Sequence, residues 1–127
     1  MLAEMEISAV TALLRSKASR KKRFMIGIAG PPGAGKSTLA TQLRDAQIAA
    51  GESAIVVPMD GFHYDDAILN ARDQRGRKGA PHTFDVAGFE VLLKRIKARE
   101  PEIAIPVFDR NMELSRNAAD IVSGETK

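Results

Sequence analysis

The chain has 127 residues, of which 44% are hydrophobic and 28% are charged, and its formal net charge is +3. This length suits one domain, and this balance of apolar and charged residues is typical of a globular chain and excludes general disorder. The sequence contains no cysteine, which excludes disulfides and thiolate metal sites and fits a reducing cytoplasm.

Nothing in the sequence indicates export or membrane insertion. The N-terminus is acidic and lacks the basic and then apolar order of a signal peptide, and no apolar run approaches the ~20 residues that span a bilayer. The basic cluster Arg20–Arg23 has no interleaved aromatic residues, so we expect it to be solvated and not to bind nucleic acid. We therefore expect a cytoplasmic protein with no membrane or nucleic-acid partner.

The first elements in chain order are a helix and a buried strand. Apolar spacing through Val10, Leu13 and Leu14 predicts an amphipathic helix over residues 2–17. The run Phe24–Ala29 is apolar almost throughout, which predicts a strand that is buried on both faces, as in a parallel sheet.

A complete phosphate-binding pattern follows this strand, with the spacing glycine, four residues, glycine, lysine and a hydroxyl residue. Its glycines allow consecutive backbone N–H groups to turn inward and meet phosphates at the positive end of the next helix. Lys36 is expected to reach the β- and γ-phosphates, and Ser37 to place its hydroxyl on Mg²⁺. We expect a nucleoside triphosphate to bind Gly30, Pro31, Pro32, Gly33, Ala34, Gly35, Lys36, Ser37 and Thr38.

The helix after this loop is expected to run to about Ala50, with Gly51 as its left-handed terminator. Residues 54–57 predict a second buried strand, and Asp60 follows it. A carboxylate there can take a proton from an attacking hydroxyl or hold a magnesium-bound water. The position of Asp60 directly after the second strand favours the role of base, while a metal role and a structural cap stay open.

Aspartates are also predicted to begin two later helices. Asp65 can cap a short helix over residues 67–72, and Asp85 can cap a longer one over residues 86–99, which Pro101 stops. The longer helix has an apolar face of Val86, Phe89, Leu92, Leu93 and Ile96.

The last part of the chain has weaker signals. Ile103–Ile105 and Val107–Phe108 predict a short extended segment that Pro106 interrupts, and residues 111–127 are weakly patterned. The alternation of strands and helices predicts an α/β layered fold that binds its ligand at the carboxyl ends of the strands.

Four segments resemble, in order, the motifs of the phosphoribulokinase, uridine kinase and type I pantothenate kinase superfamily: Gly30–Thr38, Met59–His63, Arg77–Asp85 and Ile105–Arg110. The combination is most similar to bacterial proteins labelled as fructose transport-system kinases or nucleoside/nucleotide kinase family proteins. The resemblance covers residues 24–110 and implies a P-loop NTPase-type three-layer sandwich with a mainly parallel sheet.

The resemblance also implies roles for individual residues. Lys36 and Asp60 would be catalytic, with Asp60 as general base, ATP and Mg²⁺ as cofactors, and Ser37 and Asp60 near the metal. The acceptor substrate would lie at His63, Lys78, Asp85, Asp109 and Arg110. On the residues alone, Asp85 is explained equally well as a helix cap, Lys78 is explained better as a solvated loop charge, and core packing of His63 stays open as the weaker alternative.

The chain departs from this superfamily at its end. There the superfamily continues into a strand that ends in a glutamate-glycine pair, a lid with an arginine and an adenine-binding loop, whereas this sequence stops at Lys127. We therefore expect one domain over residues 1–127, with a helix and basic linker over 1–22 and an incomplete nucleotide-binding core over 23–127. An unfilled sheet position also favours a homo-oligomer.

The sequence thus favours an ATP-dependent kinase that transfers a γ-phosphoryl group to a hydroxyl of a sugar, nucleoside or pantothenate-like small molecule. The alternative is a truncated nucleotide-binding remnant without turnover. A regulatory GTPase or a nucleic-acid ATPase is disfavoured, because no Asn-Lys-x-Asp guanine motif is present.

Overall fold

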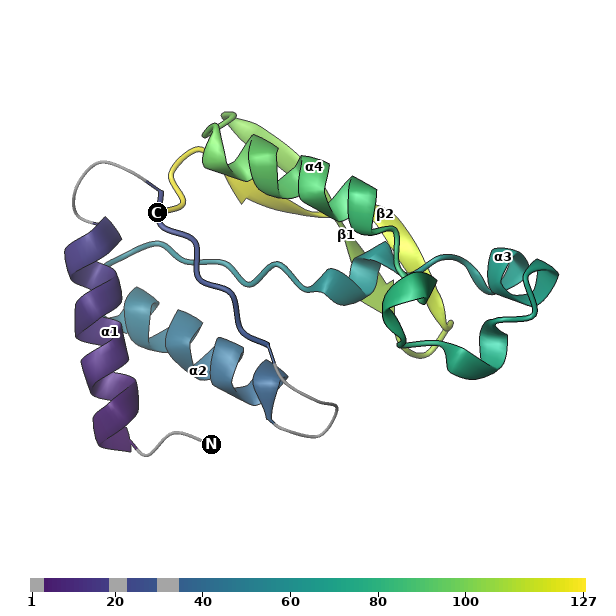
Figure 1. Ribbon diagram of the computed structural model, residues 1–127. Coiled ribbons are helices and arrows are strands. Elements are labelled where there is room, and N and C mark those ends of the chain that lie inside the picture. Colours follow the sequence, from purple (N-terminus) through teal and green to yellow (C-terminus); the bar gives the residue numbers. More distant parts are fainter. Residues whose placement is uncertain (1–3, 19–22, 30–34) are drawn as a thin grey trace. The chain divides into compact units, whose positions relative to one another are not determined.

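The computed structural model describes residues 4–18, 23–29 and 35–127 (Figure 1). The chain divides into two compact units, one formed by residues 1–56 with 125–127 and one formed by residues 57–124. The helices and strands in chain order are α1 (Glu4–Ala18), α2 (Lys36–Ala49), α3 (Asp66–Ala71), α4 (Val86–Lys97), β1 (Glu102–Asp109) and β2 (Leu114–Ser123), with short 3₁₀ helices η1 (Met59–Phe62), η2 (Arg75–Arg77) and η3 (Pro81–Thr83).

Two helices form most of the first unit. α1 and α2 pack together, with Leu14 and Leu43 buried and the Gln47 side-chain amide donating a hydrogen bond to the backbone oxygen of Thr11 at 3.0 Å. The predicted end of α2 is confirmed, because Gly51 has a φ of 88° directly after the last turn. The sequence predicts that Leu13 belongs to the apolar face of this first helix. That prediction is wrong, since the Leu13 side chain is exposed.

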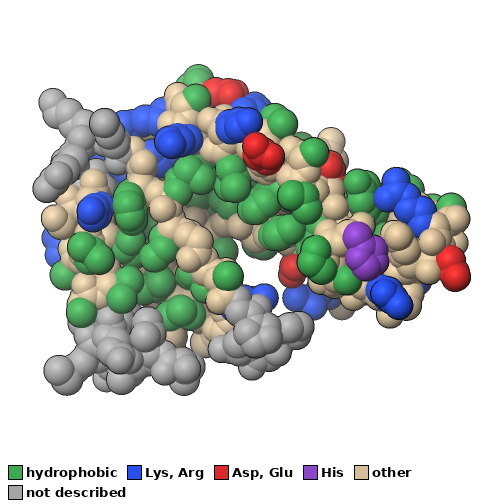
Figure 2. Space-filling model, viewed as in Figure 1, with side chains coloured by type: hydrophobic (Ala, Val, Ile, Leu, Met, Phe, Trp, Pro, Cys, Tyr) green, Lys and Arg blue, Asp and Glu red, His purple; other side chains and the backbone are tan. Residues whose placement is uncertain are grey.

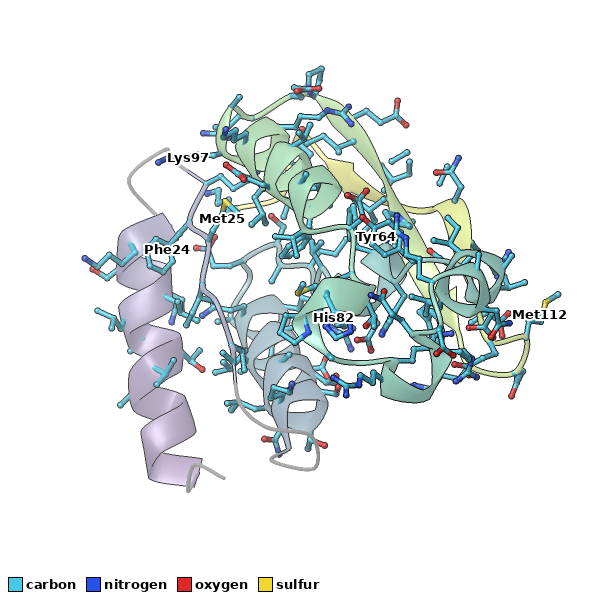
Figure 3. All side chains as sticks on the ribbon, turned by 45° about the vertical axis from the view of Figure 1, so that its right-hand side comes forward. Phe24, Met25, Tyr64, His82, Lys97 and Met112 are labelled. Carbon is cyan, nitrogen blue, oxygen red and sulfur yellow. The ribbon has the colours of Figure 1, made fainter. Side chains whose placement is uncertain are left out.

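The two predicted strands of this unit are not formed. Residues 24–29 have no assigned secondary structure, and Phe24, Met25 and Ile26 are exposed (Figure 3). Residues 54–57 are half-buried and also irregular. A parallel strand is stabilised by ladder bonds to neighbouring strands, whereas in the described part of the chain the assigned sheet consists of β1 and β2. The chain is therefore α/β, but a parallel sheet is not confirmed.

The second unit is built on an antiparallel hairpin. β1 pairs with β2 from Glu102 opposite Ser123 to Asp109 opposite Leu114. The register shifts between Ile105 and Val107, and the predicted interruption at Pro106 is thereby confirmed, because proline has no N–H to donate to the ladder.

β2 lies within the segment that the sequence left weakly patterned. Most of its residues are exposed, and Val122 is its one buried side chain. A strand with so little burial shows no alternation of apolar and polar residues, so the sequence of residues 114–123 does not predict a strand.

Helix α4 lies along the hairpin (Figure 1). It begins where predicted, with an Asp85 carboxylate oxygen accepting a hydrogen bond from the Gly88 N–H at 3.0 Å, and it ends at Lys97, two residues before the predicted end. Val86 is exposed, so its predicted place on the apolar face is wrong. The Asp65 cap of α3 is confirmed by its bond from the Ala67 N–H. The buried apolar side chains of this unit are Leu69, Leu92, Ile96, Ile103, Ile105 and Val122.

The turn η1 approaches β1 so closely that it requires a glycine. A Cβ atom on Gly61 would lie 2.6 Å from the Pro106 backbone oxygen and 2.9 Å from its carbonyl carbon. We therefore predict that Gly61→Ala lowers the free energy of unfolding by about 1 to 3 kcal/mol, measured by urea unfolding, because backbone must move to make room.

Gly76→Ala is the matched control for this change. A Cβ on Gly76 meets nothing within 4 Å, so its effect on unfolding should be small. Equal stabilities of the two variants would contradict the close packing of η1 on β1.

Candidate functional site

The phosphate-loop residues Gly30–Ala34 lie outside the described residues, and the structure describes the loop from Gly35 onward. Gly35 has a φ of 85°, and α2 begins at Lys36 with no side-chain cap and no acidic residue in its first turn. The first N–H groups of a helix have no acceptor within the helix and carry the positive end of its dipole. This helix start is therefore suited to an anion such as a phosphate.

Asp60 lies in η1, where it joins two other predicted site residues. Its carboxylate is 3.3 Å from the Arg110 guanidinium, and these side chains are 44% and 80% exposed. Its backbone oxygen accepts a hydrogen bond from the His63 N–H at 3.2 Å and lies 2.8 Å from the ring nitrogen Nδ1 of His63. The structure thus brings Asp60, His63 and Arg110 together at an accessible surface.

His63 also packs in an aromatic cluster. Its ring centroid lies 4.0 Å from that of Phe84 and 5.1 Å from that of Phe108. The packing interpretation of His63 is therefore confirmed, while its role at an acceptor stays a prediction.

Lys78 lies in a cluster of charged side chains and is not a solvated loop charge, so that interpretation is wrong. Its side chain is 9% exposed, and its ammonium lies 2.7 Å from the Asp66 carboxylate and 3.0 Å from the Glu113 carboxylate. The same ammonium lies over the Phe108 ring at 4.9 Å, and Arg75 adds a second ion pair to Asp66. Figure 2 shows Lys and Arg side chains gathered at the end of the second unit, where α3 lies.

These contacts shift two pKa values. The hydrogen bond from Lys78, with a further one from Arg75, holds the pKa of Asp66 below its ordinary value of 3.8. Burial acts to lower the pKa of Lys78, but the hydrogen bonds to Asp66 and Glu113 together outweigh it and raise the pKa above the ordinary 10.5. Asp66 and Lys78 are therefore both charged throughout the neutral pH range.

Asp85 and Asp109 both have structural hydrogen bonds. Asp85 is the α4 cap, as its alternative interpretation predicts. One oxygen of the Asp109 carboxylate accepts hydrogen bonds from the N–H groups of Asn111 and Met112, both at 3.0 Å, and so shapes the hairpin turn. Figure 3 shows Met112 at the tip of this turn. An acceptor-binding role of either aspartate stays a prediction.

An open pocket of about 330 Å³ lies beside η1. His63 and Asp85 line it together with Ser115 and Asn117 of β2, and the Ser115 hydroxyl donates a hydrogen bond to the Gly61 backbone oxygen at 2.5 Å. Sequence reasoning missed Glu113, Ser115 and Asn117 because nothing in the pattern indicated that β2 exists.

The described residues hold neither a metal-binding cluster nor a membrane-spanning helix. Within residues 4–18, 23–29 and 35–127, no group of three or more His, Cys, Asp or Glu side chains is arranged to hold a metal ion. Among those same residues, no helix has both the length and the apolar character needed to cross a membrane.

The sequence is similar to named kinases. It is 38% identical over 96 residues to a Schizosaccharomyces pombe protein named "putative uridine kinase", covering 70% of this chain and 41% of that protein. It is 32% identical over 114 residues to the pantothenate kinase of Brucella ovis, covering 88% of this chain and 34% of that enzyme. The chain thus spans about two fifths or less of the length of these curated relatives. No family model matches it.

The fold is also similar to that of a solved kinase structure. The crystal structure of a "putative fructose transport system kinase" from Silicibacter sp. TM1040 superposes with a TM-score of 0.80 at 38% sequence identity. The match covers 92% of this chain and 59% of that one.

The lowered pKa of Asp66 predicts a pH dependence of stability. A carboxylate whose pKa is lower in the folded state stabilises the fold above its unfolded pKa, and this contribution is lost as the pH falls through the folded value. Asp66→Asn should therefore be less stable than the parent protein at neutral pH, and the difference should shrink between about pH 5 and about pH 2. Urea unfolding at each pH measures this.

Glu90→Gln provides the control. Glu90 forms an exposed pair with Lys94 on α4, which should contribute little at any pH. A difference between Asp66→Asn and the parent that stays constant down to pH 2 would contradict the assigned ion pairs.

Proposed function

Because the chain belongs to the P-loop kinases of the uridine kinase and pantothenate kinase family, we propose that it forms the nucleotide- and acceptor-binding part of an ATP-dependent small-molecule kinase. The acceptor group is a hydroxyl of a sugar, a nucleoside or a pantothenate-like alcohol. The observation that carries this proposal is the accessible Asp60 carboxylate, which pairs with Arg110 and directly precedes residues 61–63, which line an open pocket of about 330 Å³.

The nucleotide phosphates are assigned to the start of α2. Lys36 and the first N–H groups of the helix bind the β- and γ-phosphates, and the remaining loop residues from Gly30 to Ala34 complete the cradle. The hydroxyl of Ser37 is an oxygen ligand of the kind that Mg²⁺ prefers, so it fits this ion, while a metal role of Asp60, whose carboxylate offers the same kind of ligand, stays the alternative to its role as base. When bound, Mg²⁺ neutralises charge on the phosphates.

Asp60 is assigned the role of general base. Its carboxylate takes the proton of the acceptor hydroxyl while the hydroxyl oxygen forms a bond to the γ-phosphorus, and the bond from that phosphorus to the bridging oxygen of ADP breaks. Arg110, which is 80% exposed, is free to move and to contact the negative charge of the transferring group.

The acceptor is assigned to the surface around η1. His63 and Asp85 line the pocket there, while Asp109 ends β1 and Arg110 follows it. Since Asp85 and Asp109 each use one carboxylate oxygen to bind backbone N–H groups, an acceptor hydroxyl would contact the other oxygen.

Three broader expectations stay proposals for the whole protein. They are a mainly parallel three-layer sandwich, a homo-oligomer and a cytoplasmic location. The first is supported by the TM-score of 0.80 to a kinase structure that is longer than this chain.

We predict that Asp60→Asn lowers kcat for phosphoryl transfer by about 10²- to 10⁴-fold and leaves the Kd for magnesium-ATP nearly unchanged, because the base acts on the acceptor. ADP release with a panel of sugars, nucleosides and pantothenate measures transfer, and calorimetry measures nucleotide binding.

Asp73→Asn is the control, since Asp73 is exposed and its φ of 55° suits asparagine. Nucleotide binding by the parent chain without ADP release would favour the remnant without turnover. Loss of nucleotide binding in Asp60→Asn would contradict the base assignment and favour the metal role.

A further inference from the structure

The contacts of the Lys78 ammonium occupy it on every side that the structure describes. Two of its N–H groups face carboxylates, at 2.7 Å on Asp66 and 3.0 Å on Glu113, and Phe108 covers it at 4.9 Å from the ring centroid. Because the side chain is only 9% exposed and two of its three N–H donors face carboxylates, little of the ammonium is accessible to a further ligand.

The two carboxylates belong to parts of the chain that are far apart in sequence. Asp66 lies in the first turn of α3, and Glu113 lies in the turn of the β1–β2 hairpin. Glu113 has a φ of 54°, a conformation that is costly for a residue with a Cβ and that needs support from its surroundings. The ion pair to Lys78 is such a support.

A chain of contacts leads from Lys78 to the proposed catalytic carboxylate. Lys78 lies over the Phe108 ring, the Phe108 and His63 rings are 5.1 Å apart, and His63 Nδ1 is 2.8 Å from the Asp60 backbone oxygen. All these residues lie in the second compact unit. The hairpin turn and the acceptor surface are thereby linked through one buried cation.

We propose that Lys78 is a positioning residue and does not bind the acceptor. Its ion pairs to Asp66 and Glu113, called the clasp below, link the hairpin turn to α3. The same side chain holds the ring of Phe108 against His63 beside Asp60. This assigns Glu113 and Asp66 as its partners in the same task. The part that concerns the acceptor rests on the proposed function, whereas the clasp itself does not.

Hydrogen exchange of the full 127-residue chain tests the clasp without any need for activity. Lys78→Met removes the charge at similar length, and Glu113→Gln removes the hairpin half of the clasp. Amide exchange of residues 109–115 should become about tenfold faster in both variants, as expected for loss of a charge-assisted hydrogen bond, while α4 exchanges as in the parent. Lys94→Met, which changes an exposed lysine on α4, should leave the hairpin amides unchanged.

Steady-state kinetics provide the second measurement. Lys78→Met and Glu113→Gln should raise the KM for the acceptor by a similar factor and leave the KM for ATP unchanged, because both variants loosen the same surface. A chain without transfer activity would contradict the proposed function, and hydrogen exchange would then still decide about the clasp.

Two results would overturn the proposal. One is parental hairpin exchange in Lys78→Met together with a raised acceptor KM, which would make Lys78 a substrate ligand. The other is a Glu113→Gln variant whose hairpin exchange equals that of the parent, and this variant decides the question if Lys78→Met fails to fold.

Discussion

The close approach of η1 to β1 is the contact on which the rest of the candidate site depends. Gly61 lies against the backbone of Pro106 with no room for a Cβ, and Ser115 of β2 donates a hydrogen bond to the Gly61 oxygen. On the other side of the turn, the rings of Phe62 and Phe89 pack 5.1 Å apart. Because η1 is held between the hairpin and α4, the residues that flank Gly61 are placed by packing.

The cations of the ion pairs near this turn differ in burial, since the Arg110 side chain is 80% exposed and the Lys78 side chain is 9% exposed. The pair of Asp60 and Arg110 is exposed, so it contributes little to stability, and both groups can exchange partners. The Lys78 side chain is 9% exposed although its partners Asp66 and Glu113 are 33% and 44% exposed, and a buried ammonium without a partner is costly, so these pairs fix the loop before α4 relative to α3 and the hairpin. The exposed charges of Asp60 and Arg110 are thus available for a reaction on a surface that the buried Lys78 ammonium helps to hold in place.

The phosphate and acceptor parts of the proposed site are built in different ways. The phosphate part is one contiguous motif at the start of α2, so it can be recognised from the sequence alone. The acceptor part combines η1, the loop before α4 and both strands of the hairpin, so small changes in any of them alter it. The similar proteins are named for uridine, pantothenate and a fructose transport system.

The sequence by itself determined the family and the features that depend on near neighbours along the chain. The span of α2 and its Gly51 terminator, the Asp65 and Asp85 caps and the interruption at Pro106 involve residues within a few positions of one another, so their patterns were sufficient. Of the candidate site, the grouping of Asp60, His63 and Arg110 agrees with the predicted motifs.

Tertiary structure decided the features that depend on distant partners. β2 forms a strand because its backbone pairs with that of β1, although the residues of β2 are mostly exposed. The burial of Lys78 depends on Glu113, which lies on that strand's turn, and the exposure of Phe24–Ile26 reflects the absence of an assigned strand beside them among the described residues. The physical reason is that ladder bonds and ion pairs join groups far apart in sequence, whereas caps and turns are local.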